Sequence, residues 1–326
     1  MQRRTVLYSV GVLAGGALLP GLTHAQGVYP DHPINLVIPF PPGGLADTVG
    51  RMLVPALEAA LGKPLVPVNR AGAAGAIGAA SVVNAKADGY TLLFTLSSIS
   101  TLPEQSRVNN QKPSFLLNQL KPVARVSTDP MVVLTHADSP YKDFRQLLAD
   151  AKVRSGLVSY GSSGVYGTVH VPAEMLAHAA GVKFNHVPYT GGGPLLQGLL
   201  GKQVDFTLLP RSSSMAHLRG GRVRALAVLD NQRWPQLPDV PTTRELGLDV
   251  NYLPWTGLLA PEGTPEPVLA KLRGAVAQVV KSPAFLASLE KSEGTLAYLD
   301  SAEFQKFWDS EIGRLNEVIK RIGKME

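Results

Sequence analysis

Short apolar runs alternate with stretches of helical spacing along most of the chain. Apolar residues recur at helical spacing over 47–61, where Pro55 predicts a kink or a late helix start. A small-residue helix is expected to open at Gly72 and to run to about Ala85. Runs bounded by proline, glycine or polar residues predict buried strands at 34–40, 65–69 and 90–96. This β-α-β-α-β order predicts a parallel sheet with right-handed crossovers.

The second half of the chain repeats the alternation and predicts a second α/β unit. Its expected strands are 157–160, 184–188, 204–209 and 224–229, and its expected helices are 144–152, 171–180, 194–200 and 215–220. Residues 103–120 are expected to be irregular, 123–135 to form one long extended segment, and 250–259 to return in extended form. Helices at 265–280, 283–291 and 302–322 are expected to complete the first unit. The predicted fold is α/β, with lobe 1 at 26–129 plus 253–326 and lobe 2 at 130–252.

The N-terminus has the pattern of an export signal. Arg3 and Arg4 precede an apolar, small-residue run over 6–22, and Thr23-His24-Ala25 fits a signal-peptidase site. We therefore expect residues 1–25 to be removed and the protein to reside in the periplasm. An ordinary secretory signal, a twin-arginine signal and an uncleaved anchor all remain open at this point.

Composition narrows the classes of function. Of 326 residues, 45% are hydrophobic and 17% charged, which is an ordinary globular balance. The absence of cysteine excludes disulfides, thiolate zinc sites and a cysteine nucleophile. Removing the two arginines of the signal lowers the formal net charge from +6 to +4, and no basic block with interleaved aromatics occurs. We therefore expect no nucleic-acid partner.

Two glycine-rich turns carry the clearest candidate chemistry. Each follows an apolar run and precedes a helical pattern, so its free backbone N–H groups can hold an anion without a charged side chain. The candidate ligand-binding residues are Phe40, Pro41, Gly43, Gly44, Leu45, Ala46, Asp47 and Thr48 in the first turn, and Ser162, Ser163, Gly164, Tyr166, Gly167 and Thr168 in the second. Helix capping is an equal alternative for Asp47, and turn chemistry is the alternative for the serines, although the pairing of the two turns favours binding.

Further candidates lie at other predicted strand ends. Ser97 and Ser98 end the third strand, at the edge where open α/β sheets bind ligands. Tyr189 opens a third glycine turn before a helix. Arg211 is suited to pair bidentately with a carboxylate, with a solvent-facing arginine as the alternative. The repeat Gly72-x-x-Gly75-x-x-Gly78 is better explained by close helix packing than by dinucleotide binding.

Enzyme signatures are missing from the sequence. It contains no Gly-x-Ser-x-Gly elbow, no His-Glu-x-x-His and no Walker loop, and its seven histidines are scattered without metal-ligand spacing. His170, at the start of a predicted helix, is expected to be structural. We predict no catalytic residue, no metal and no cofactor.

The turn sequences resemble the Bug family, the periplasmic receptors of tripartite tricarboxylate transporters. The resemblance rests on segments in family order and spacing, at 29–44 with Asp47, 69–72, 88–93, 161–164 with His170 and Glu174, 186–191, 224–228, 237–242 and 257–261. It implies a type II periplasmic-binding-protein fold with an interlobe cleft. It also implies a small carboxylate ligand, held by backbone amides and waters at residues 40–48 and 162–168.

Departures from the family pattern leave the ligand's identity open. They are Ala71, Ala76, the segment 95–98 and the segment 209–211, and residues 107–118 also match poorly. Individual specificity is expected at Ser97, Ser98, Tyr166, Tyr189 and Arg211.

The expected function is a monomeric receptor that captures a small organic carboxylate. Hinge motion near residues 126–133 and 250–256 would close the lobes, and a membrane permease would recognise the loaded form. A co-receptor for a two-component sensor kinase is an alternative from a second class, and an exported enzyme on the same scaffold is a third.

Overall fold

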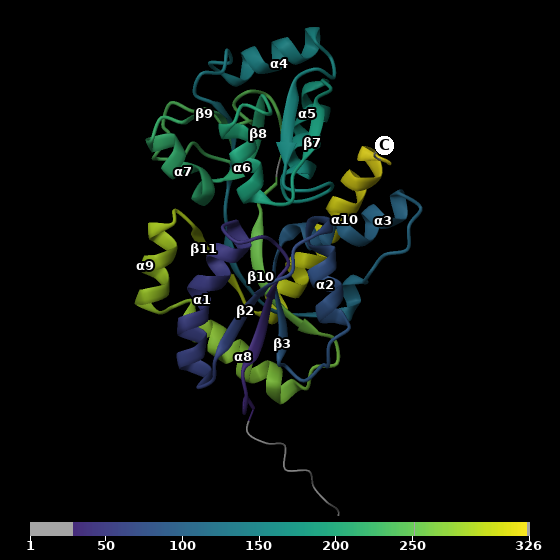
Figure 1. Ribbon diagram of the computed structural model, residues 1–326, viewed down its shortest axis with the longest axis vertical. Coiled ribbons are helices and arrows are strands. Elements are labelled where there is room, and N and C mark those ends of the chain that lie inside the picture. The colour runs from purple at the N-terminus through teal and green to yellow at the C-terminus, as the bar shows by residue number, and fades with distance from the viewer. Residues whose placement is uncertain (1–28, 251, 325–326) are drawn as a thin grey trace, which may run out of the picture.

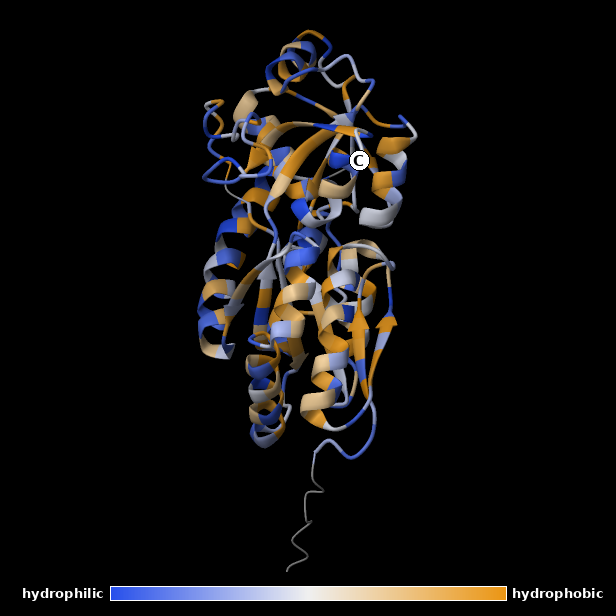
Figure 2. Cartoon of the chain, turned by 90° about the vertical axis from the view of Figure 1, so that its left-hand side faces the viewer, coloured by the Kyte–Doolittle hydropathy of each residue, from blue (hydrophilic) through white to orange (hydrophobic). Residues whose placement is uncertain are grey.

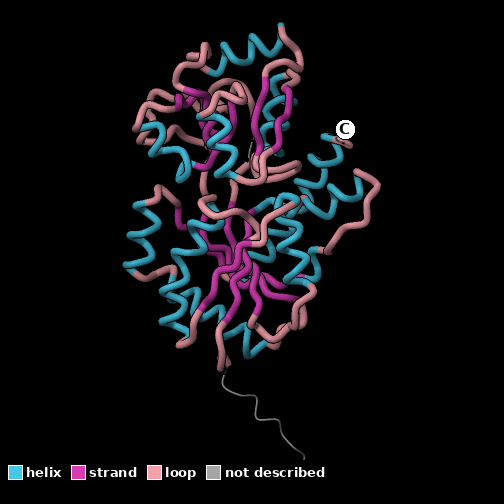
Figure 3. Tube along the Cα trace, viewed as in Figure 1, coloured by secondary structure: helices cyan, strands magenta, loops and turns pink. Residues whose placement is uncertain are grey.

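The computed structural model describes residues 29–250 and 252–324. The predicted signal, residues 1–25, lies outside the described residues. Two β-sheets form two bodies, each covered by helices, and the chain passes between them through extended segments (Figure 1). Loops gather between the two groups of strands (Figure 3). No helix in the described ranges is long and apolar enough to cross a membrane.

The first sheet has the strand order β11-β4-β10-β3-β1-β2. Its strands are β1 (Ile34–Ile38), β2 (Leu65–Asn69), β3 (Thr91–Leu96), β4 (Leu120–Thr128), β10 (Trp255–Pro261) and β11 (Thr295–Leu299). Strand β1 pairs in parallel with both β2 and β3, which confirms the predicted parallel unit. The sequence did not predict β11, a largely half-buried edge strand that forms by pairing with β4.

The second sheet has the order β7-β6-β8-β5-β9. Its strands are β5 (Met131–His136), β6 (Ser159–Ser162), β7 (Asn185–Pro188), β8 (Phe206–Pro210) and β9 (Val223–Leu229). Strands β6, β7 and β8 are parallel, and β5 runs antiparallel between β8 and β9. The predicted second α/β unit is therefore present.

The helices of the first body correct two expectations. They are α1 (Leu45–Leu61), α2 (Ala76–Val83), α3 (Leu102–Val108), α8 (Glu266–Val279), α9 (Pro283–Lys291) and α10 (Ser301–Ile322). Helix α1 starts early and continues past Pro55, which lies on its exposed face, where water can serve the freed carbonyl. Helix α3 falls in a segment expected to be irregular. It forms because Pro103 occupies its first turn, where a missing N–H is harmless, and because the helix packs against α10.

The second body carries α4 (Phe144–Val153), α5 (His170–Ala180), α6 (Gly192–Leu200) and α7 (Arg211–Arg219). Helix α7 begins four residues before the predicted start at Met215. Its first N–H groups are met from the crossing segment: Arg211 N donates to Pro130 O at 2.9 Å, and Ser212 N lies 3.3 Å from the Asp129 carboxylate. This cap is distant in sequence, so helical spacing alone did not reveal it.

Two extended crossings join the bodies. The segment expected to be continuous over 123–135 is two strands of different sheets, because the chain changes direction at Asp129-Pro130. Asp129 N donates to Pro254 O at 3.0 Å and so ties one crossing to the other. Burial raises the pKa of the Asp129 carboxyl to about 7.

Helix α10 is a third connection between the bodies. Its first half contributes Phe304 and Trp308 to a core under the first sheet, whereas Leu315 and Ile319 belong to the core of the second body. It therefore does more than complete the first unit, and Figure 1 shows it rising from one body beside the other. Apolar residues concentrate on the strands and on the inward sides of the helices (Figure 2).

A buried polar network secures the middle of α10. The Glu311 carboxylate accepts hydrogen bonds from Trp255 Nε1 at 2.6 Å and from Ser100 Oγ at 3.1 Å. Ser100 in turn accepts from Trp308 Nε1 at 2.8 Å. Burial raises the pKa of Glu311 to about 7, although its hydrogen bonds favour the ionised form.

Candidate functional site

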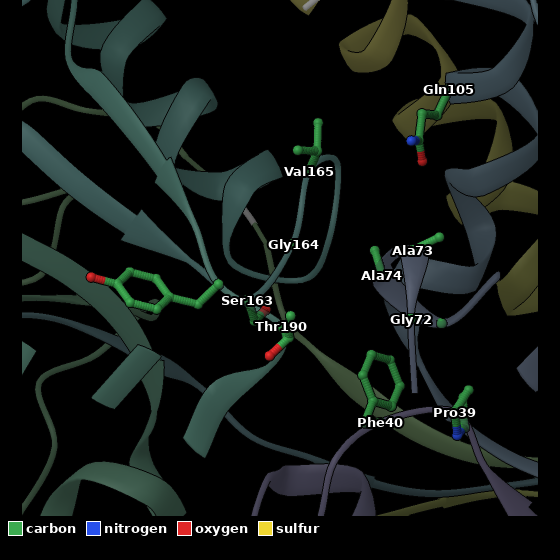
Figure 4. Close-up of a pocket in the computed structure, with 12 residues that line it drawn as sticks. Pro39, Phe40, Gly72, Ala73, Ala74, Gln105, Ser163, Gly164, Val165 and Thr190 are labelled. Atoms are coloured by element: carbon green, nitrogen blue, oxygen red, sulfur yellow. The ribbon is translucent and has the colours of Figure 1, made fainter. Parts of the chain in front are cut away.

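Two neighbouring cavities lie between the bodies. The larger, of about 310 Å³, is lined from the first body by Pro39, Phe40, Gly72, Ala73, Ala74, Gly75 and Gln105, and from the second by Ser163, Gly164, Val165, Tyr189 and Thr190. Figure 4 shows these two sets facing one another. The smaller, of about 40 Å³, is lined by Phe40, Pro41, Gly44, Leu45, Leu96, Ser163, Thr168, Val169, Gly192, Leu209, Pro210 and Ser213. Both cavities touch Phe40 and Ser163.

The cavities lie where strands end and helices begin. Residues that follow or end β1, β3, β6, β7 and β8 contribute to the lining, and so do the first residues of α1, α6 and α7. Parallel strands place their carboxyl ends at one edge, and each following helix points its N-terminus back toward that edge. The local alternation of strand, turn and helix therefore produces this convergence.

The lining offers neutral hydrogen-bond donors. Helix α1 with its N-cap Gly44 and α6 with Gly191 lack a side-chain cap, so no side chain serves their first N–H groups. Helix α5 contributes less, because Val171 N donates to Gly167 O at 3.2 Å and Pro172 has no N–H. Thr168 is 4% exposed and lines the smaller cavity, and its Oγ1 is close to Tyr252 yet has no hydrogen-bond partner. No Asp, Glu, Lys, Arg or His is among the residues that line either cavity. The arrangement suits an anion held by dipoles and hydroxyls.

Two glycines of the second body approach the first body closely. A Cβ on Gly191 would lie 2.8 Å from Pro41 Cδ, and one on Gly164 would lie 3.2 Å from Ala74 Cβ. Their φ values are +144° and +133°, in the range that favours glycine. The bodies therefore meet around the cavities, at positions where side chains would hold them apart.

Part of the predicted site lines the cavities directly. These residues are Phe40, Pro41, Gly44, Leu45, Ser163, Gly164, Thr168 and Tyr189. Three others shape the turns: Gly43 N donates to the Asp47 carboxylate, Thr48 N donates to Gly44 O, and Gly167 N donates to Gly164 O. Ala46 is buried in the core. The Asp47 carboxylate also accepts from Arg51 Nε at 2.9 Å and Asn69 Nδ2 at 2.8 Å. The hydrogen bonds of Asp47 therefore stabilise the turn between β1 and α1.

The remaining predicted residues bond elsewhere. Ser97 Oγ lies 3.2 Å from Tyr252 OH, and Ser98 Oγ donates to Ala74 O at 3.3 Å. Tyr166 is 1% exposed, and its hydroxyl donates to Gly323 O at 2.6 Å, at the end of α10. None of these three is among the lining residues, so they support the cavity walls.

Arg211 also bonds away from the cavities. Its Nε donates to Glu293 O at 2.9 Å and its guanidinium to Thr295 Oγ1 at 2.6 Å, both in the first body. The guanidinium also stacks on Trp234, with 5.6 Å from its carbon to the ring centroid. In this structure Arg211 connects the two bodies beside the crossings and makes no contact with the cavities.

Several lining residues were absent from the predicted set. Residues 72–75 were interpreted as the start of a packed helix, but they form a turn in which Ala73 and Ala74 have φ of 46° and 53°. The glycines around these alanines were the available signal. Gln105 comes from α3, which lies in the segment that was expected to be irregular. Leu96, Leu209 and Pro210 were noted only as departures from a family pattern, and Val169 and Ser213 carried no signal at all.

A serine–histidine pair lies behind the second turn. Ser162 Oγ is 2.6 Å from His186 Nε2, and the His186 ring stacks on His170 and on Tyr160. Burial lowers the pKa of His186 to about 4 and that of His170 to about 3, so both rings are neutral at pH 7. Ser162 is fully buried and lines neither cavity, so the pair positions the turn. Across the described ranges, no cluster of three metal-ligating side chains occurs.

Comparisons with known proteins agree with this geometry. The family model described as "Tripartite tricarboxylate transporter family receptor" matches residues 49–324. Protein BugT of Bordetella pertussis is 31% identical over 324 residues, which cover 99% of each chain. Among solved structures, periplasmic binding protein BugD is 30% identical with a TM-score of 0.83, covering 90% of this chain and 98% of its own.

Two further solved structures contain ligands. MatC from Rhodopseudomonas palustris with bound malate is 28% identical with a TM-score of 0.82, covering 89% of this chain and 100% of its own. A second R. palustris protein, with adipate, is 28% identical with a TM-score of 0.83, covering 90% and 97%. These likenesses confirm the expected two-lobed periplasmic-binding-protein fold.

Proposed function

The chain belongs to the tripartite tricarboxylate transporter receptor family, and from this premise we propose that it is a periplasmic receptor for a small organic carboxylate. The ligand would be held between the lobes and delivered to the membrane permease of such a transporter. The malate and adipate in related structures support the class of ligand. The family is one of binding proteins. We propose that the protein does not alter its ligand chemically, since Ser162, the serine that is paired with His186, is shielded from the cavities.

One observation carries this proposal. The uncapped N-termini of α1 and α6 and the unpartnered Thr168 hydroxyl converge on a cavity that no charged side chain lines. A carboxylate would satisfy these donors and gain from the helix dipoles. A cation or an apolar molecule would leave them unsatisfied, at a cost of about 1–3 kcal/mol for each buried polar group.

We further propose that binding is coupled to lobe closure. The proposed lobes are 26–129 with 253–326, and 130–252, with hinges near 126–133 and 250–256. A ligand selects closure only through contacts that are better when the lobes are together, and both lobes contribute to both cavities. We propose that a monomer acts alone and that the loaded form is the one a permease, or a sensor kinase, recognises after export.

Thermal unfolding with a panel of carboxylates tests the binding function. A ligand at a hundredfold over its Kd stabilises the folded state by about 2.7 kcal/mol and raises the Tm accordingly. Neutral sugars and the amides of the same acids serve as controls. If no small carboxylate raises the Tm, the proposal is wrong.

Thr168→Val tests whether the cavity is the binding site. Valine keeps the shape and removes a hydroxyl that has no partner, so the ligand-free Tm should stay level or rise. Carboxylate affinity should fall about 10- to 150-fold, because a hydrogen bond to a charged group contributes about 1.5–3 kcal/mol. Thr168→Ser is the matched control and should retain binding. Unchanged carboxylate affinity in Thr168→Val would show that the carboxylate binds elsewhere.

A further inference from the structure

The smaller cavity differs in chemistry from the loops that frame it. Its inner surface is made by Phe40, Leu45, Leu96, Val169, Leu209 and Pro210. Leu96, Val169 and Leu209 are 8%, 2% and 1% exposed, so they present a dry wall rather than a surface open to water. The polar side chains that reach the cavity are the hydroxyls of Ser163, Thr168 and Ser213.

No cation is available to this cavity from the nearby arginines. Arg51 is engaged by Asp47 and by Asn69 Oδ1 at 2.8 Å. Arg211 follows the lining residue Pro210 but bonds to Glu293 O and Thr295 Oγ1. A second carboxylate placed among the leucines would therefore be desolvated without an ionic partner, which is strongly unfavourable.

From this lining we propose that the ligand is an apolar monocarboxylate with a short tail, and not a di- or tricarboxylate. The carboxylate lies near Ser163 and Thr168, beside the uncapped starts of α1 and α6, and the tail lies against Leu96 and Leu209. This cavity of about 40 Å³ has room for about three waters, so a tail that stays within it is limited to a few carbon atoms. This inference rests on the proposed carboxylate-binding function and narrows its ligand class.

Calorimetry with pairs of equal chain length tests the ligand class. Butanoate is compared with succinate and malate, and hexanoate with adipate, on the mature protein. Each monocarboxylate should bind at least about tenfold more tightly than its diacid, because the second charge is buried without a partner. Butanoate should bind better than hexanoate, since the cavity is short. Diacids that bind as tightly as the monoacids overturn the ligand class but leave the receptor function intact, whereas no binding by any acid overturns both.

Ser213→Arg tests where the tail lies. Ser213 is half-buried at the start of α7, so an arginine can enter from the helix surface without filling the core. The new guanidinium should raise the affinity for succinate relative to butanoate about tenfold or more, by pairing with the second carboxylate. Ser213→Gln is the neutral control of similar length and should leave the ratio unchanged. An unchanged ratio in Ser213→Arg, with the wild-type Tm retained, shows that the tail lies elsewhere and overturns this placement.

Discussion

Gly191 is the position where one added methyl group tests whether ligand binding requires the two lobes to meet. Its Cα lies in the turn before α6, with φ of +144°. A Cβ there would lie 2.8 Å from Pro41 Cδ and 3.0 Å from Pro41 Cγ, both on the opposite lobe. Real Cβ atoms essentially never approach another atom within 3.0 Å, so Gly191→Ala forces the turn or the lobe to move.

The substitution carries two costs that act on different measurements. Alanine at this φ strains the backbone by about 1–3 kcal/mol, which lowers the stability of the ligand-free protein. Crowding against Pro41 costs about a further 1–3 kcal/mol, and only while the lobes are together. If binding requires closure, that second cost weakens carboxylate affinity about 5- to 150-fold.

Calorimetric titration of four variants separates the two costs. Gly193→Ala is the matched control, because Gly193 lines neither cavity and a Cβ there would come no closer to another atom than Pro42 O at 3.7 Å. Pro41→Ala removes the ring atoms that the new methyl group would strike, so the Gly191→Ala/Pro41→Ala double variant should recover much of the lost affinity. The coupling energy of this cycle isolates the contact between lobes. The reasoning is refuted if Gly191→Ala binds as tightly as Gly193→Ala, or if adding Pro41→Ala leaves the loss unchanged.

Three further predictions concern the lobe connections and the buried carboxylate. The raised pKa of Glu311 contributes stability that is fully present below about pH 4.5 and is lost as the pH rises through about 7. In denaturant titrations from pH 4 to 8, the free energy of unfolding of the wild type should therefore fall by about 3 kcal/mol relative to that of Glu311→Gln. Parallel pH profiles of the two proteins would contradict this. Arg211→Gln and Thr295→Val should each lower the Tm and leave carboxylate affinity within a few-fold of the wild-type value. A selective loss of affinity in Arg211→Gln would instead show that the arginine contacts the ligand. Phe304→Ala should cost about 3–5 kcal/mol in urea unfolding with an unchanged m-value, since the ring is fully buried against Trp255; a cost under 1 kcal/mol would refute the packing.

Local sequence patterns predicted the helices, strands and turns that are determined by their own residues. The apolar runs of β1 to β3 and the glycine turn after β1 were recognised because periodicity and turn chemistry act over a few residues. Helix α9 was predicted with its observed bounds, since Pro283 occupies its first turn. The same signals placed eight of the predicted ligand-binding residues on the cavity walls.

Elements that depend on distant partners could not be predicted from local sequence patterns. The start of α7 is set by Asp129 and Pro130, about 80 residues earlier in the chain. Strand β11 exists because β4 offers it a free edge, and α10 crosses to the second body because its apolar side chains meet both cores. In each case the deciding contact joins residues far apart in the sequence.

The sequence by itself determined the family, the two α/β units and the glycine turns that supply backbone donors, because these depend on local geometry and order along the chain. Only the tertiary structure decided what each candidate side chain does. It placed Tyr166 and Arg211 in connections between the lobes, and it brought Leu96 and Leu209 together around one cavity. The physical reason is that a side chain's partner is set by how the two bodies face each other, and residues from opposite lobes carry no mutual signal in the sequence.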